Sequence, residues 1–144
     1  MYKALDVARY IVNKCIDDNL PISNIQLQKI LYCIQRKCLQ IYGRELFSDE
    51  IEAWPFGPVV PEVYYRYCGF GANSIRIKNA ADCEDNIFGD YISLINYIVE
   101  EKRALKPWNF SEDVQKAGHA YNIVYDDGAG SHKIIPKSLI KEKG

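Results

Sequence analysis

The sequence predicts a mainly α-helical fold that also holds a small two-stranded antiparallel β-ribbon. Apolar residues recur at helical spacing in two long stretches near the N-terminus, whereas a short stretch at residues 51–53 alternates apolar and polar residues. The chain has 144 residues, of which 48% are hydrophobic and 26% charged, as in ordinary globular domains. We therefore expect a single compact domain over residues 1–144, built from about five to six helices.

The first two predicted helices are separated by a tight turn. Residues 4–16 carry their apolar side chains on one face, and the stretch ends before Pro21, because a residue that precedes proline disfavours the helical conformation. Ser23 and Gln26 then form a capping box, in which the two side chains pair with backbone N–H groups that the first helical turn leaves unpaired. The second helix continues to Gly43, a residue suited to end a helix.

The middle of the chain changes its periodicity. Residues 51–53 predict a short strand, and residues 55–58 predict a turn, because their two prolines lack N–H donors. Residues 75–77 alternate apolar and polar side chains and predict the antiparallel partner of that strand. Pro61 suits the first turn of a further, tyrosine-rich helix, which ends at Gly69.

Three more helices are predicted in the C-terminal half. Residues 88–99 return to helical spacing. Ser111, followed by two acidic residues, predicts the start of a helix that continues to Tyr125. Pro136 begins a last short helix, and residues 141–144 are expected to fray.

Charge and apolar patterning exclude several classes of protein. The 18 basic and 19 acidic residues give a formal net charge of -1, so the strong positive field that dominates nucleic-acid binding is missing. No apolar run approaches the roughly 18–20 residues that cross a bilayer, and the N-terminal residues interleave charge in a way that secretory signals do not. We therefore expect a cytoplasmic protein that binds neither nucleic acid nor membrane.

The five cysteines form an odd set without a C-x-x-C pair, which fits neither a disulfide framework nor a zinc site. We interpret them as reduced thiols. Cys15 and Cys38 continue apolar helical stripes and are expected to be small buried hydrophobic residues.

The residues needed for catalysis are scarce. The chain holds two histidines, His119 and His132, and lacks the local motifs of serine and cysteine hydrolases. Ser131 precedes His132, but sequence neighbours seldom face each other in a productive triad. The glycine pairs lack the further residues of nucleotide-binding loops. We expect no enzyme, no catalytic residue, no metal site and no cofactor; a hydrolase that uses His119 is a distant alternative.

A DNA-binding regulator built on the first two helices is the main alternative function. The second helix carries Lys29, Arg36 and Lys37, and a short turn precedes it. A recognition helix should, however, place polar side chains at its N-terminal end, where this helix is apolar. A solvated helix face explains the three basic residues more simply.

The most distinctive motif runs from Glu52 to Tyr64 and combines large aromatic side chains with rigid backbone. Aromatic side chains that lose little entropy on binding are enriched at protein-recognition sites. Trp54 and Phe56 could instead fold inward as core residues, and both roles can hold at once. The candidate partner-binding residues are Trp54, Phe56, Tyr64 and Tyr65, held by Pro55, Gly57, Pro58 and Pro61.

Several motifs resemble one known family in their order and spacing. They are Leu5–Ile11, Ile22–Tyr32, Gly43–Phe47 and above all Glu52–Pro61, and Ala120-Tyr121 with Tyr125 and Gly128 is similar to the family's C-terminal segment. Together they resemble the Panacea domain, the SocA-like family also called phage-associated protein.

This resemblance implies a mainly helical antitoxin, the half of a toxin–antitoxin pair that neutralises a cognate toxin protein by direct contact. It also implies a second partner, because the SocA-like member acts as a proteolytic adaptor that delivers its toxin to an ATP-dependent protease. Neither activity requires chemistry from the domain itself, in agreement with the scarcity of catalytic residues. The identity of the toxin does not follow from the resemblance.

Overall fold

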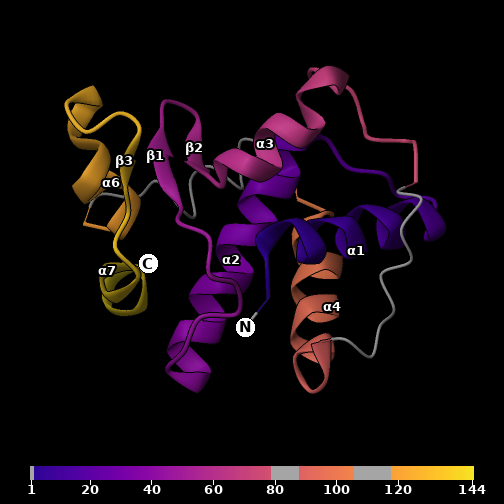
Figure 1. Cartoon of the computed structure of the whole chain (residues 1–144), viewed down its shortest axis with the longest axis horizontal. Coiled ribbons are helices and arrows are strands. Elements are labelled where there is room, and N and C mark those ends of the chain that lie inside the picture. Colours follow the sequence, from indigo (N-terminus) through magenta and orange to yellow (C-terminus); the bar gives the residue numbers. More distant parts are fainter. Residues whose placement is uncertain (1, 79–87, 106–117) are drawn as a thin grey trace.

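The computed structural model describes residues 2–78, 88–105 and 118–144 of the chain. Within them, six α-helices and three short strands confirm the mainly helical class (Figure 1). The helices are α1 (Ala4–Asp17), α2 (Asn24–Tyr42), α3 (Pro61–Tyr67), α4 (Tyr91–Lys102), α6 (Ala120–Tyr125) and α7 (Lys137–Lys143). The strands are β1 (Glu52–Trp54), β2 (Gly57–Val59) and β3 (Lys133–Ile134), and two 3-10 turns, η1 (Cys68–Phe70) and η3 (Asp126–Gly128), complete the set.

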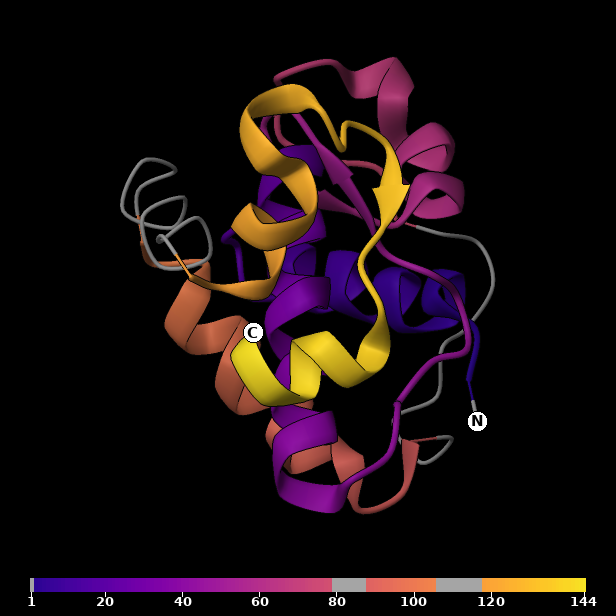
Figure 2. The same ribbon diagram turned by 90° about the vertical axis from the view of Figure 1, so that its left-hand side faces the viewer.

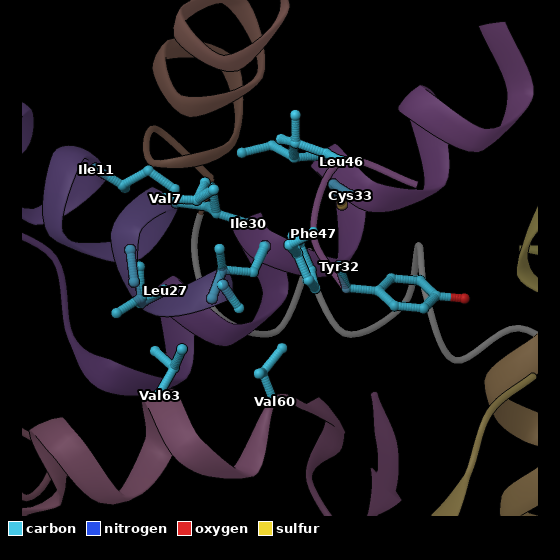
Figure 3. Close-up of a cluster of buried hydrophobic side chains, with 14 of the residues drawn as sticks. Val7, Ile11, Leu27, Ile30, Tyr32, Cys33, Leu46, Phe47, Val60 and Val63 are labelled. Carbon is cyan, nitrogen blue, oxygen red and sulfur yellow. The ribbon is translucent and has the colours of Figure 1, made fainter. Parts of the chain in front are cut away.

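Helix α2 is the central element of the fold. It begins with the predicted capping box between Ser23 and Gln26 and ends at Gly43, whose φ of 71° is left-handed. The helices α1, α3, α4 and α7 all pack against it (Figure 1). Figure 3 shows apolar side chains of α1, α2 and α3 converging on one cluster, among them Val7, Ile11, Leu27, Ile30 and Val63. A helix surrounded in this way is buried on nearly every side.

This central position overturns the expectation that the basic residues of α2 form a solvated face. Lys29 is 3% exposed and Arg36 is 8% exposed, and only Lys37 of the three faces solvent. Burial lowers the pKa of Lys29 from its usual value, although Cys33 acts in the opposite direction. Arg36 lies over the ring of Tyr32, 5.8 Å from its centroid.

The strands form one antiparallel sheet in the order β2-β1-β3, and the predicted partner of β1 was wrong. Glu52 pairs with Val59 of β2 and with Ile134 of β3. Residues 75–77 lie elsewhere: the N–H of Ile75 donates to the carbonyl of Ile22 at 2.8 Å. A two-residue turn closes the β1–β2 hairpin at a smaller cost in chain entropy than a loop of more than twenty residues. Pro58 is tolerated in β2, because this strand is an edge of the sheet.

The C-terminal half follows the predictions in part. Helix α4 occupies much of the stretch predicted at residues 88–99, and α7 follows Pro136 but continues to Lys143, into the segment expected to fray. The start of the helix predicted at Ser111 lies outside the described residues. Helix α6 begins only at Ala120, after Gly118 with a φ of 84°.

The cysteines in the described part of the chain are not paired in disulfides. Cys15 and Cys38 are fully buried as predicted, and burial raises the pKa of both thiols. Cys33 is also buried, Cys68 is exposed, and Cys83 lies outside the described residues. No helix in the described part of the chain is both long and apolar enough to cross a membrane.

An ion pair joins the C-terminal end of α4 to the C-terminal end of α1. Arg103 lies 2.8 Å from the carboxylate of Asp18, and Lys14 lies 3.1 Å from the same carboxylate. The hydrogen bond from Arg103, followed by that from Lys14, lowers the pKa of Asp18 below its ordinary value.

We expect Asp18→Asn to lower the free energy of unfolding by at most about 1 kcal/mol near neutral pH, because the pair is partly exposed. Because the pKa of Asp18 is lower in the folded than in the unfolded protein, its ionised form stabilises the fold at pH values above the unfolded-state pKa of about 3.9. This stabilisation is lost as the pH falls through the folded-state pKa. The difference between wild type and variant in urea titrations should therefore shrink below about pH 4. Asp17→Asn is the matched control, because its pair with Lys78 is exposed on both sides. An equal loss in both variants would contradict this assignment.

Candidate functional site

The hairpin, α3 and β3 bring five rings together into a cluster that we call the aromatic face. Its members are Trp54, Phe56, Tyr64, Tyr65 and His132. Figures 1 and 2 place the three elements side by side at one end of the molecule. The four predicted aromatic residues thus do lie together, and His132 joins them from a distant part of the chain.

Trp54 is the centre of the aromatic face. Its ring centroid lies 4.5 Å from that of His132, 5.1 Å from that of Tyr64, and 6.0 Å from those of Phe56 and Tyr65. The indole Nε1 donates to Oε1 of Glu52 at 2.9 Å. Edge-to-face and tilted contacts at these separations are favourable for aromatic pairs. The rings therefore contact one another directly and form a packed surface.

Burial separates the rings into a floor and a rim. Trp54 is 6% exposed, yet it does not belong to the main core cluster around α2. Phe56 and Tyr64 are half-buried, and Tyr65 is 63% exposed. Trp54 therefore lies beneath the other rings, whereas Tyr65 is largely exposed to solvent.

The predicted supporting residues hold the backbone of the hairpin and α3. Pro55 and Phe56 form the turn between β1 and β2, and Gly57 pairs with Trp54 at a φ of 138°, which disfavours any side chain. Pro58 is buried and pairs with Ala53. Pro61 is the first residue of α3, where its missing N–H costs no helical hydrogen bond.

Two anchors from the C-terminal segment were not assigned to the site from the sequence. Tyr121 of α6 donates its hydroxyl proton to the carbonyl of Trp54, and its ring stacks on Tyr125 at 5.3 Å. The N–H of His132 donates to the carbonyl of Ala53 at 2.6 Å, and its φ of 67° turns the chain into β3. His132 was weighed only as a catalytic base. Tyr121 was signalled by the family resemblance, but not as a neighbour of Trp54.

The two histidines lie in different surroundings. Contrary to the expectation for sequence neighbours, Oγ of Ser131 and Nδ1 of His132 do lie 3.0 Å apart, although this pair is exposed. His119 precedes α6 and is partly buried. In the described ranges, no group of three or more His, Cys, Asp or Glu side chains is placed to hold a metal ion.

Comparison with known proteins assigns the family. Residues 27–121 match the family described as "Antitoxin SocA-like, Panacea domain". The protein named "Antitoxin SocA" from Caulobacter vibrioides is 41% identical over 87 residues, which make up 60% of this chain and 45% of that protein. The chain thus corresponds to less than half of that relative, and no solved structure matches it. Because the family match covers most of the chain, including the hairpin and α3, this chain belongs to the SocA-like Panacea domain family.

Proposed function

We propose that this protein is a cytoplasmic antitoxin that neutralises a cognate toxin by direct protein–protein contact through the aromatic face. Family membership and the name of the Caulobacter relative support the antitoxin role. The observation that carries the contact surface is the packed aromatic face itself, with Tyr65 63% exposed above a buried Trp54. Partly exposed tyrosines around a buried tryptophan match the composition of binding hot spots.

The contact must extend beyond the five rings. A stable protein–protein interface buries about 1,200–2,000 Å² in total, more than a small cluster supplies. Ile134 of β3 is 51% exposed and pairs with Glu52 of β1. Glu52 is also the residue that accepts the hydrogen bond from the indole of Trp54. Directly paired residues of neighbouring strands share a face, as do alternate residues of one strand, so Ile134 lies on the same side of the sheet as Glu52 and Trp54. The proposed contact therefore includes β3.

The test is co-expression with the toxin encoded in the neighbouring reading frame, followed by measurement of the Kd of the purified pair. Wild type should restore growth and bind the toxin. Tyr65→Ala should raise the Kd at least about tenfold, as a hot-spot residue does, and leave the melting temperature nearly unchanged. Tyr97→Ala is the matched control, because Tyr97 is 66% exposed but lies on α4. Equal affinities for the two variants would refute the assigned surface.

The same experiment separates simple masking from delivery to a protease. If contact is sufficient, rescue of growth persists in a host that lacks the ATP-dependent protease. If the protein is a proteolytic adaptor, rescue is lost in that host although the Kd is unchanged. Both outcomes retain the antitoxin role and require the contact surface.

The DNA-binding alternative receives no support from the structure. Two of the three basic residues that suggested it, Lys29 and Arg36, are buried inside the fold and do not present their charges to a phosphate backbone. A titration against operator DNA at several salt concentrations checks this directly, because phosphate contacts produce a steep dependence on salt. We expect weak binding without such a dependence.

A further inference from the structure

Two buried amide side chains of α2 form hydrogen bonds to α3 and to the residue before it. Asn24 and Gln28 are one helical turn apart near the start of α2, and each is 2% exposed. Buried amides are costly unless hydrogen bonds satisfy them, so their partners show what such residues hold in place.

The two side chains form a continuous relay of hydrogen bonds to α3. The backbone N–H of Val60 donates to Oε1 of Gln28 at 2.9 Å. Nε2 of Gln28 donates to Oδ1 of Asn24 at 3.0 Å. Nδ2 of Asn24 then donates to the carbonyl of Tyr64, also at 3.0 Å. The relay therefore binds the backbone of α3 at two points, the residue before the helix and a residue one turn inside it.

The position of α3 depends on contacts of this kind. The helix has seven residues, too few to be stable alone, and no side chain caps its N-terminus. Tyr64 and Tyr65 both extend from it toward Trp54, with ring centroids 5.1 and 6.0 Å away. A small rotation or shift of α3 would separate these rings from Trp54.

We infer that Gln28 and Asn24 are positioning residues of the aromatic face, which fix α3 against α2, hold Tyr64 and Tyr65 next to Trp54, and thereby set the affinity for the partner. This inference rests on the proposed function as far as the partner is concerned. It assigns a binding role to two residues that do not reach the surface. The packing of Tyr64 and Tyr65 on Trp54 should depend on them whether or not the partner is a toxin.

A third buried amide provides a matched control. Gln35 lies on the same helix and is 0% exposed. Its Oε1 accepts from the N–H of Leu46 at 2.9 Å and of Phe47 at 3.3 Å, and its Nε2 donates to the carbonyl of Phe47 at 2.9 Å. Gln35 thus resembles Gln28 in residue type, helix and burial, but it holds the 46–47 segment instead of α3.

The experiment compares Gln28→Met with Gln35→Met in the full chain. Both variants leave buried backbone groups without partners and should lower the melting temperature. Only Gln28→Met should raise the Kd for the partner, by about tenfold or more, which corresponds to about 1.4 kcal/mol of binding free energy. If the two variants weaken binding equally, or if neither does, the positioning role is wrong.

A spectroscopic measurement tests the relay without a partner. In a chain with Trp108→Phe, Trp54 is the only remaining tryptophan. Gln28→Met should then shift the emission maximum of Trp54 and weaken its near-ultraviolet circular dichroism, whereas Gln35→Met should leave both unchanged. Unchanged spectra in Gln28→Met would overturn the inference. If the wild type does not bind the toxin but Gln28→Met shows the expected spectral shift, only the proposed function is refuted and the positioning role stands.

Asn24→Ala is the second variant, for use if Gln28→Met does not fold. It removes the last link of the relay, to the carbonyl of Tyr64, and leaves the bond between Gln28 and Val60 in place. We expect the same spectral shift and a rise of the Kd in the same direction. A folded Asn24→Ala protein with wild-type spectra and wild-type affinity would contradict the relay.

Discussion

Replacement of Trp54 by alanine is expected to lower the free energy of unfolding by about 3–5 kcal/mol, the range typical for truncation of a large buried aromatic side chain. The indole is 6% exposed and contacts four other rings, and its Nε1 is bonded to Glu52. Truncation removes these contacts and leaves a cavity beneath α3. The midpoint of urea unfolding should fall with little change in the slope.

Trp54→Phe is the control for this prediction. It keeps an aromatic ring against Tyr64 but loses the hydrogen bond to Glu52, so its cost should be clearly smaller. A cost below about 1 kcal/mol for the alanine variant would mean that the ring packs poorly in solution. Because truncation also loosens the face, loss of partner binding by Trp54→Ala does not identify a direct contact. Tyr65→Ala serves that purpose, since Tyr65 is mostly exposed.

Features determined by neighbouring residues could be predicted from the sequence. The capping box at Ser23 and Gln26 and the left-handed end at Gly43 are both present, because each depends on only a few consecutive residues. The grouping of Trp54, Phe56, Tyr64 and Tyr65 was predictable for the same reason. The predicted turn at residues 55–58, followed at once by a short helix, keeps these side chains near one another, whereas the packing of Tyr64 and Tyr65 on Trp54 also depends on the hydrogen bonds from α2 to α3.

Features that depend on distant segments could not be predicted. His132 reaches Trp54 only because β3 pairs with β1, and a two-residue strand has no recognisable periodicity. Lys29 and Arg36 are buried because helices from the C-terminal half also pack on α2. The periodicity of a single helix shows its most apolar face, but it does not show how many neighbours surround it. Similarly, residues 75–77 alternate like a strand but pair with no strand of the sheet.

The hydroxyl of Tyr121 ties α6 to the aromatic face, and its loss should be the second largest change in stability. Tyr121 is 2% exposed and donates to the carbonyl of Trp54. We expect Tyr121→Phe to cost about 1–3 kcal/mol near neutral pH, because a buried carbonyl loses a donor while the ring is kept. Tyr125→Phe is the control: that side chain is partly exposed and stacks on Tyr121. Its cost should be well below that of Tyr121→Phe.

The pH dependence gives this assignment a specific signature. Burial, followed by the charge of Tyr125, raises the pKa of Tyr121 to about 12, although a hydrogen bond from the backbone of Gly57 acts in the opposite direction. Because the pKa of Tyr121 is higher in the folded than in the unfolded protein, its protonated hydroxyl stabilises the fold fully at pH values below the unfolded-state pKa of about 10. This stabilisation is lost as the pH rises through the folded-state pKa. The free energies of unfolding of wild type and Tyr121→Phe should therefore converge between about pH 10 and 12. A constant difference across that range would show that the Tyr121 hydroxyl is not a buried donor, and it would remove the anchor that joins the C-terminal segment to Trp54.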